Sequence, residues 1–168
     1  MRHSWQATLA GDGDATPYQA KAERLGIASR VRFSGWLDRS RLTALLEGAT
    51  ILVLPSRAEA LPMSVLEALA HGLAVVTTAV GALPDSLVDE QSVVFIEPDN
   101  VGALAAALDR LLMDEPFRRR LAQAGHEVFL REFDIAVTAD RFAQIYRELT
   151  ERGAATRRRS RALASRAA

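Results

Sequence analysis

Short apolar runs alternate with helical patterns over the first hundred residues, and this alternation limits the fold more than any other feature. The runs are β-branched or nearly continuous in apolar residues, which is typical of strands covered on both faces. Alternating strands and helices predict a parallel sheet built from βα units. We therefore expect an α/β fold with a Rossmann-like parallel sheet and flanking helices. The predicted strands are residues 5–10, 31–34, 51–54, 74–77 and 93–96, and the predicted helices are 15–25, 39–47, 62–71 and a short one near 84–88.

The pattern after the last strand is purely helical. Asn100 is placed to cap a helix that extends to Met113. Pro116 suits the first position of the next helix, because proline lacks the amide that would be unpaired there. A third helix follows Asp134 and is expected to end at Gly153.

Length and composition predict one domain, residues 1–151, followed by a basic tail, residues 152–168. The chain has 168 residues, of which 49% are apolar and 25% are charged, as in an ordinary globular domain. The tail holds six of the 21 basic residues and no acidic residue. We expect the tail to be disordered and solvated. The alternative is that the tail contacts an anionic surface. We expect that surface to be a membrane and not a nucleic acid.

Several classes of function are excluded or disfavoured by composition. The chain has no cysteine, which rules out disulfides and thiolate chemistry and suits a reducing, cytoplasmic location. No apolar run approaches the roughly 18 residues of a membrane span, and the first residues lack signal-peptide character. The three histidines show no metal-ligand spacing, so we expect neither a metal site nor a cofactor.

Two glutamates bracket the start of a predicted helix within residues 55–68. Glu59 lies in the loop after a predicted strand, and Glu67 lies about one helical turn past the start of the helix. Between them are the unpaired amides of the helix N-terminus, which attract anions. Either glutamate alone is compatible with an ordinary surface charge. Together they fit a ligand with phosphates in its middle and hydroxyl groups at both ends, which is the shape of a nucleotide-sugar.

Glycine turns follow three of the predicted strands, at the edge where open α/β sheets bind ligands. The turn Gly11-Asp12-Gly13 predicts a tight connection more than a phosphate loop, because Thr16 replaces the third glycine of G-x-G-x-x-G. Gly81 permits close approach of a ligand to the backbone, and a simple turn is an equal alternative. Trp36 and Phe33 are placed to flank a base, although core packing is the expected role of Phe33.

These motifs, in this order, resemble the C-terminal, donor-binding half of a family 4 glycosyltransferase of the GT-B fold. The resemblance covers about residues 5–152. It is carried by Gly11-Asp12-Gly13, Val31-x-Phe33-x-Gly35, Val53-Leu54-Pro55-Ser56, the Glu-x7-Glu signature of Glu59 and Glu67, Glu67-Ala68-Leu69-Ala70-x-Gly72, Val75-Val76-Thr77-Thr78 and Val80-Gly81.

The resemblance implies an activity and a role for each motif. Family members transfer a glycosyl group from a nucleotide-sugar with retention of anomeric configuration, mainly by stabilising charge on the departing diphosphate. Glu59 is then the expected catalytic residue and binds hydroxyls of the donor sugar, while Glu67 binds the ribose hydroxyls. The donor is expected to be a UDP- or GDP-sugar. The remaining expected contacts are Leu61, Met63 and Ser64 for the diphosphate, Gly81 near the sugar, and Phe33, Ser34 and Gly35 beside the nucleobase.

Some family features are replaced or missing in this sequence. Pro62 stands where the family often has glycine, so it offers no amide, and Ala82 replaces the second glycine of a usual pair. The acceptor-binding N-terminal domain is absent, as is the first strand of the C-terminal domain with its diphosphate-binding arginine and lysine. We therefore expect a domain truncated on its N-terminal side.

The expected loss of that strand leaves two alternatives for the sheet. In the order 3-2-1-4-5-6 the first strand is central. Either the strands at residues 5–10 and 51–54 pair directly, or a central gap remains that another polypeptide fills. A gap leaves two unpaired strand edges and exposed apolar surface.

Two functions from different classes follow. The first is the donor-binding part of a retaining glycosyltransferase, active with a separate acceptor-binding polypeptide. The alternative is a non-catalytic nucleotide-sugar-binding module or an inactive truncated product. A sugar epimerase of the same fold is a weaker third option, because such enzymes also need both domains.

Overall fold

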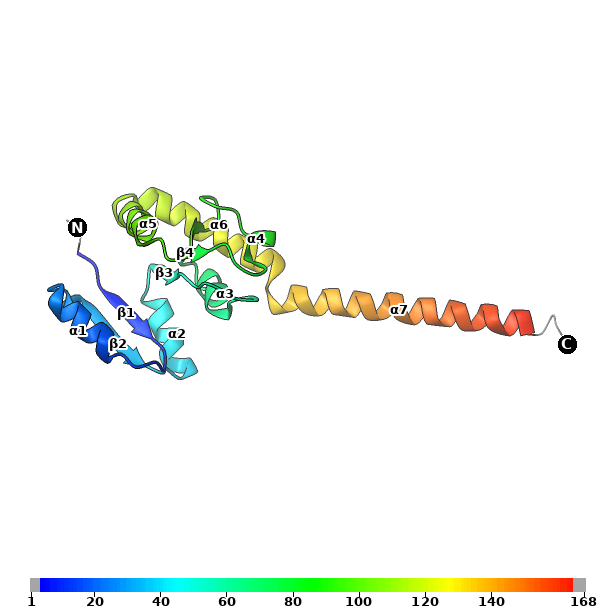
Figure 1. Ribbon diagram of the computed structural model, residues 1–168. Coiled ribbons are helices and arrows are strands. Elements are labelled where there is room, and N and C mark those ends of the chain that lie inside the picture. Colours follow the sequence, from blue (N-terminus) through cyan, green and yellow to red (C-terminus); the bar gives the residue numbers. More distant parts are fainter. Residues whose placement is uncertain (1–3, 165–168) are drawn as a thin grey trace. The chain divides into compact units, whose positions relative to one another are not determined.

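The computed structural model describes residues 4–164, with side chains through residue 151. The chain divides into two compact units, Met1–His126 and Glu127–Ala168. Among the described residues, the first unit alternates strands and helices as predicted (Figure 1). Its strands are β1 (Ala7–Ala10), β2 (Val31–Gly35), β3 (Ile51–Leu54), β4 (Ala74–Thr78) and β5 (Val94–Ile96). Its helices are α1 (Thr16–Arg24), the 3₁₀ helix η1 (Ala28–Arg30), α2 (Arg39–Glu47), α3 (Met63–Ala70), α4 (Leu83–Ser86), α5 (Val101–Met113) and the start of α6 (Glu115–Glu132).

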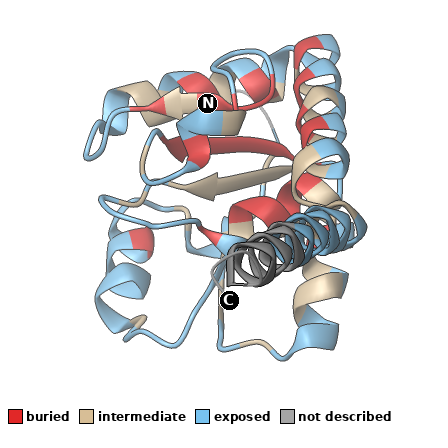
Figure 2. Cartoon of the chain, turned by 90° about the vertical axis from the view of Figure 1, so that its right-hand side faces the viewer, coloured by how far each residue is buried: buried red, intermediate tan, exposed pale blue. Residues whose placement is uncertain are grey.

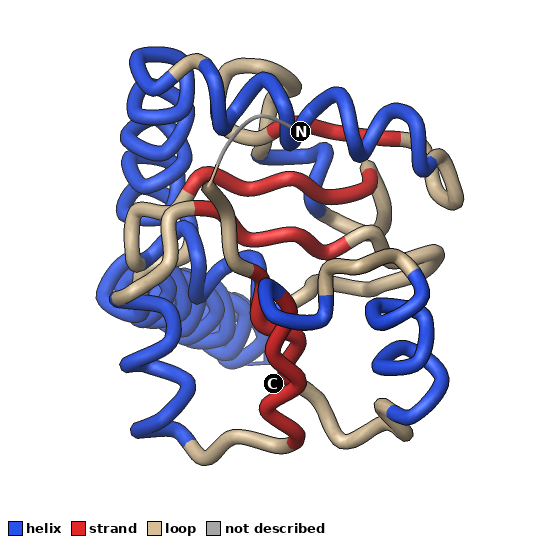
Figure 3. The backbone as a smooth tube through the Cα atoms, turned by 90° about the vertical axis from the view of Figure 1, so that its left-hand side faces the viewer, coloured by secondary structure: helices blue, strands red, loops and turns tan. Residues whose placement is uncertain are grey.

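All strand pairs are parallel, but the strands form two separate sheets (Figure 3). One sheet has the order β1-β2, and the other has the order β3-β4-β5. In the larger sheet Ile51 lies opposite Ala74, and Val76 lies opposite Val94. Parallel pairing places the carboxyl ends of β3, β4 and β5 at one edge, where the loops that follow them meet.

The strands β1 and β3 do not pair, so the alternative of direct pairing is wrong. Among the described residues, the structure therefore leaves an edge of β3 without a neighbouring strand. The prediction that every strand is covered on both faces is wrong. Among the five strands, only β4 is buried along its whole length, whereas all four residues of β3 are half-buried (Figure 2). Leu9 in β1 is 46% exposed.

The main core lies between β4, β5 and the helices α5 and α6. Alternate residues of each strand point to the same face, and α5 and α6 contribute apolar side chains to that face. The opposite face of β4 is covered by α3, whose buried side chains include Val65 and Leu69. The buried cluster consists of Ala74, Val76, Val94, Ile96, Ala107, Leu111, Phe117 and Leu121.

Side chains cap the starts of α5 and α2, and of these two caps only the one on α5 was predicted. The Asn100 side chain accepts a hydrogen bond from the Ala103 amide at 2.9 Å and begins α5 as expected. Asp38 caps α2 in the same way, by accepting from the Arg41 amide at 2.9 Å. Helix α6 begins at Glu115, one residue before the predicted start at Pro116. Helix α6 passes over α3 at Gly125, where an added Cβ would lie 2.7 Å from both Leu69 Cδ2 and the Ser92 carbonyl oxygen.

The second unit contains the end of α6 and the long helix α7 (Ile135–Ala164). The Asp134 carboxylate accepts from the Ala136 amide at 2.8 Å, so the predicted helix start is confirmed. The predicted end at Gly153 is wrong, because α7 continues to Ala164. A glycine inside a helix costs only about 1 kcal/mol, and good helix formers flank this one. The boundary predicted between residues 151 and 152 is therefore not the end of an element, and residues 165–168 lie outside the described part.

Candidate functional site

The loop between β3 and α3, residues 55–62, holds Glu59 through a short chain of hydrogen bonds. The buried Thr78 hydroxyl donates to the Ser56 carbonyl oxygen at 2.5 Å. The Ser56 hydroxyl in turn donates to Glu59 Oε1 at 2.9 Å. A residue of the buried strand β4 thus fixes Ser56, and Ser56 orients the exposed Glu59 carboxylate. Thr78 was not among the predicted site residues.

Gly81 packs against the same loop. Its φ is +60°, in the left-handed region that glycine adopts most easily. An added Cβ would lie 2.8 Å from the Ala60 carbonyl carbon and closer still to the carbonyl oxygens of Glu59 and Ala60. The Ala82 amide donates to the Ala60 carbonyl at 2.9 Å. The close approach that Gly81 permits in this structure is therefore to the Glu59 loop, and its contact with a donor stays a prediction.

Helix α3 begins directly after this loop with no side-chain cap. Pro62 is the N-cap, and its carbonyl accepts from the Val65 and Leu66 amides at 3.1 and 3.4 Å. The amides of Met63 and Ser64 precede the first carbonyl that a helix can offer them, so they are open to an external acceptor. Both residues were predicted to bind a diphosphate. Leu61 precedes them in the loop and is 37% exposed.

Glu67 lies on the outward face of α3. The buried residues Val65, Leu66, Ala68 and Leu69 fix the rotation of the helix. Glu67 is four residues after Met63, which is 61% exposed, so the two side chains share one face. Among the described residues, no side chain is bonded to the Glu67 carboxylate. Because side chains tilt toward the helix N-terminus, Glu67 leans back toward the open amides.

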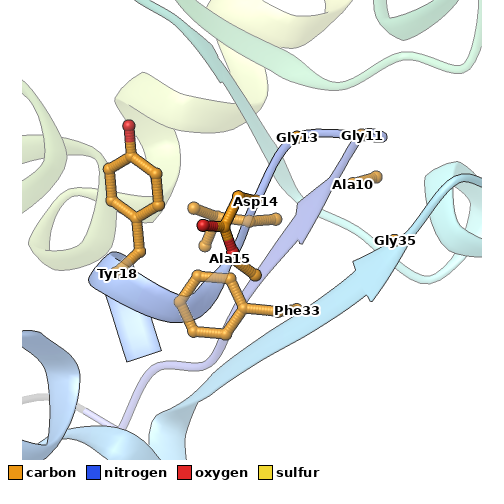
Figure 4. A pocket seen from close by; sticks show the side chains of 9 residues that line it. Ala10, Gly11, Gly13, Asp14, Ala15, Tyr18, Phe33 and Gly35 are labelled. Atoms are coloured by element: carbon orange, nitrogen blue, oxygen red, sulfur yellow. The ribbon is translucent and has the colours of Figure 1, made fainter. Parts of the chain in front are cut away.

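A hollow of about 150 Å³ lies at the carboxyl ends of β1 and β2 (Figure 4). Its lining includes Phe33 and Gly35, which were predicted to lie beside the nucleobase. It also includes Asp14 and Tyr18, which were not predicted as site residues. The Thr16 side chain and backbone donate to Asp14, which lowers the pKa of that carboxyl. Phe33 is half-buried and its ring faces Asp14, so the expectation that it packs in the core is wrong. The full lining is Leu9, Ala10, Gly11, Gly13, Asp14, Ala15, Tyr18, Phe33 and Gly35.

The other residues predicted near a base lie outside this hollow. Ser34 donates through its hydroxyl to the Leu9 carbonyl at 3.2 Å, which ties β2 to β1. Trp36 is 71% exposed. Neither Glu59 nor Glu67 lines the hollow, so the structure does not join the base-border residues and the glutamates in one cavity.

The described residues, 4–164, lack the features of two other kinds of site. No three histidine, cysteine, aspartate or glutamate side chains in this part of the chain gather as metal ligands would. None of the helices within it has the length and apolar character needed to cross a bilayer.

Comparison with known proteins decides the family. A family profile described as "Glycosyl transferases group 1" matches residues 1–128. The chain belongs to this family of glycosyltransferases. The glycogen synthase of Mycobacterium tuberculosis is a relative of this group 1 domain, 35% identical over 142 residues that cover 83% of the chain and 34% of the relative. The domain thus spans about a third of the length of the curated relatives it matches.

Solved structures of GT-B glycosyltransferases share the fold of the group 1 domain. Sucrose-phosphate synthase from Thermosynechococcus elongatus has a TM-score of 0.75 and 28% identity, over 87% of this chain and 39% of that chain. HepE of Anabaena, in complex with UDP, has a TM-score of 0.75 over 86% of this chain and 41% of that chain. At 20% identity the HepE match shows the fold alone. The predicted α/β fold is therefore confirmed.

Proposed function

We propose that this chain is the donor-binding domain of a family 4 glycosyltransferase, which transfers a glycosyl group from a nucleotide-sugar with retention of configuration. The observation that carries the proposal is the arrangement around the start of α3. Two uncapped amides, at Met63 and Ser64, lie between a carboxylate oriented from the loop and a carboxylate on the helix face. The complexes of HepE with UDP and with UDP-glucose support a nucleotide-sugar as the ligand type.

Each part of the donor has a matching group in this arrangement. The diphosphate accepts hydrogen bonds from the α3 amides, where the helix dipole favours negative charge. The Glu67 carboxylate accepts from the ribose hydroxyls, and Glu59 accepts from hydroxyls of the sugar. Gly81 lets its own loop pack closely against the Glu59 loop, beside the sugar. The proposed donor site uses no metal or other cofactor.

The chemistry follows from this placement. The bond between the sugar's anomeric carbon and the diphosphate oxygen breaks, and an acceptor hydroxyl forms a new bond to the same face of that carbon. The departing oxygen takes the electron pair, so negative charge grows on the diphosphate in the transition state, and this oxygen then accepts the proton that the acceptor hydroxyl releases. Amide donors already aimed at that charge stabilise it without rearranging. The acceptor is held by polypeptide outside residues 1–168.

Calorimetric titration of the chain with UDP and UDP-glucose tests the donor site. The variant Glu67→Gln should weaken UDP binding about tenfold or more, because hydrogen bonds to a charged group contribute about 1.5–3 kcal/mol. Glu47→Gln is the matched control, since Glu47 is an exposed helical glutamate at the end of α2. The proposal fails if neither ligand binds the unaltered chain, or if both variants bind UDP equally well.

One observation favours a second function, a nucleotide-sugar-binding module without transferase activity. Within the described residues 55–64, Arg57 is the one cationic side chain, and it is engaged by Asp99. Diphosphate departure without a cation relies on the helix amides alone. Binding of UDP-glucose without transfer or hydrolysis, when candidate acceptor-binding polypeptides are added, supports the module.

A further inference from the structure

An ion pair connects the Glu59 loop to the loop that follows β5. Arg57 Nε donates to Asp99 Oδ1 at 3.1 Å and to Oδ2 at 2.9 Å, and Nη2 donates to Oδ1 at 3.0 Å. These contacts involve both carboxylate oxygens, so they fix the orientation of the two groups as well as their distance. Arg57 follows β3 and Asp99 follows β5, and β4 lies between these strands in the sheet.

Asp99 is a firm anchor because its own loop is well bonded. Its φ is +60°, a conformation that aspartate tolerates better than most residues. Its carbonyl accepts from the Val101 amide at 3.2 Å, and the neighbouring Asn100 caps α5. Hydrogen bonds from the Arg57 guanidinium hold the pKa of Asp99 below its usual range, so this carboxylate stays charged in more acidic solution than an ordinary aspartate does.

Arg57 lies between the other attachment points of the loop. On one side the Ser56 carbonyl is held by Thr78, and on the other the Ala60 carbonyl is held by the Ala82 amide. The hydrogen bond from Ser56 to Glu59 spans the position of Arg57. A change in the course of the backbone at residue 57 therefore changes the direction of the Glu59 carboxylate.

We infer that Arg57 and Asp99 are positioning residues, which hold the loop so that Glu59 meets the donor sugar. The part that concerns the sugar rests on the proposed function. The pair acts on sugar recognition without contacting the ligand. Glu67 lies on α3, whose rotation is set by its buried face and not by this pair. Affinity for the nucleotide alone is therefore independent of the pair.

Variants of the pair separate these two affinities. We compare Arg57→Gln, Asp99→Asn and their double variant, and titrate each with UDP and with UDP-glucose. The dissociation constant for UDP-glucose should rise roughly two- to fivefold, the range for an exposed ion pair, while that for UDP stays the same. The double variant should be no weaker than either single variant, because each already removes the whole interaction.

The control is Glu90→Gln. Glu90 also has a positive φ, +55°, and also pairs with an arginine, Arg110, but it lies outside residues 55–62. The control should bind both ligands normally. Additive losses in the double variant would overturn the inference. Tighter UDP binding by Asp99→Asn would also overturn it, because it would show that a released Arg57 binds the diphosphate directly.

Amide hydrogen exchange provides a measurement that needs no ligand. The Ala82 amide, which is bonded to the Ala60 carbonyl, should exchange roughly two- to fivefold faster in each pair variant and at the normal rate in Glu90→Gln. Unchanged exchange in the pair variants refutes the positioning role, whatever the ligand data show. If the unaltered chain binds neither ligand, the proposed function fails, and the exchange rates still decide whether the pair holds the loop.

Discussion

Replacing Gly81 by alanine should displace the Glu59 loop and destabilise the first unit. The added Cβ would lie 2.8 Å from the Ala60 carbonyl carbon, with the carbonyl oxygens of Ala60 and Glu59 nearer still. The obstructing atoms are backbone, so they cannot rotate away as a flexible side chain would. The loop must move, and the hydrogen bond from the Ala82 amide to Ala60 is lost.

The expected cost has two parts. Alanine at a φ of +60° costs roughly 1–2 kcal/mol. Loss of the backbone hydrogen bond costs about 1 kcal/mol more. Gly81→Ala should therefore lower the free energy of unfolding by about 2–3 kcal/mol.

A second glycine, Gly72, separates the cost of the backbone conformation from the cost of the lost hydrogen bond. Gly72 has a φ of +69°, and nothing lies within 4 Å of an added Cβ there. Gly72→Ala should show the backbone cost alone, roughly 1–2 kcal/mol. Urea unfolding of both variants measures the difference, and titration with UDP-glucose should show weaker binding for Gly81→Ala only. Equal destabilisation and equal binding by the two variants would refute the close packing of Gly81 on the loop.

Three further changes test the fold. Asn100→Ala removes the α5 cap and should cost about 1 kcal/mol in urea unfolding. Gly125→Ala places a Cβ 2.7 Å from Leu69 Cδ2 and from the Ser92 carbonyl, so it should destabilise by roughly 1–3 kcal/mol, and a neutral result would contradict that packing. Hydrogen bonds from the Arg41 amide and, to a lesser extent, from the Ser40 hydroxyl lower the pKa of Asp38 below 3.8. The stability that this carboxylate contributes is therefore complete above pH 3.8 and is lost as the pH falls through the lower pKa of the folded state. Asp38→Asn should remove this acid-dependent part of the unfolding free energy, which urea unfolding at several pH values measures.

The elements that the sequence predicted best are set by local signals. The strand at residues 51–54 and the helix at 39–47 have the predicted bounds, because a continuous apolar run and an aspartate cap define them within a few residues. The helix end at Gly153 was predicted wrongly, because one glycine costs less than its helix-forming neighbours contribute. Pairing between β1 and β3 depends on residues more than 40 positions apart, and no local pattern decided between the two alternatives.

In the candidate site too, features set by nearby residues were predicted and contacts between distant residues were not. The spacing of Glu59 and Glu67 places them around the start of α3, because both belong to one loop and one helix. The groups that hold the Glu59 loop come from other elements: Thr78 from the end of β4 and Asp99 from the loop after β5. Neither carries a local motif that points to the Glu59 loop. Only the parallel order of β3, β4 and β5 brings them together, so the side-chain contacts required the structure.

The free edge of β3 has a consequence for work with this chain in solution. Four consecutive apolar residues, with no proline or charge among them, present unpaired backbone groups and half-exposed side chains. Such a segment adheres readily to the same segment of another molecule, as in the early steps of fibril growth. We expect the yield of folded chain to fall as its concentration rises during refolding, and a lysine in place of Val53 to relieve that loss at some cost in stability.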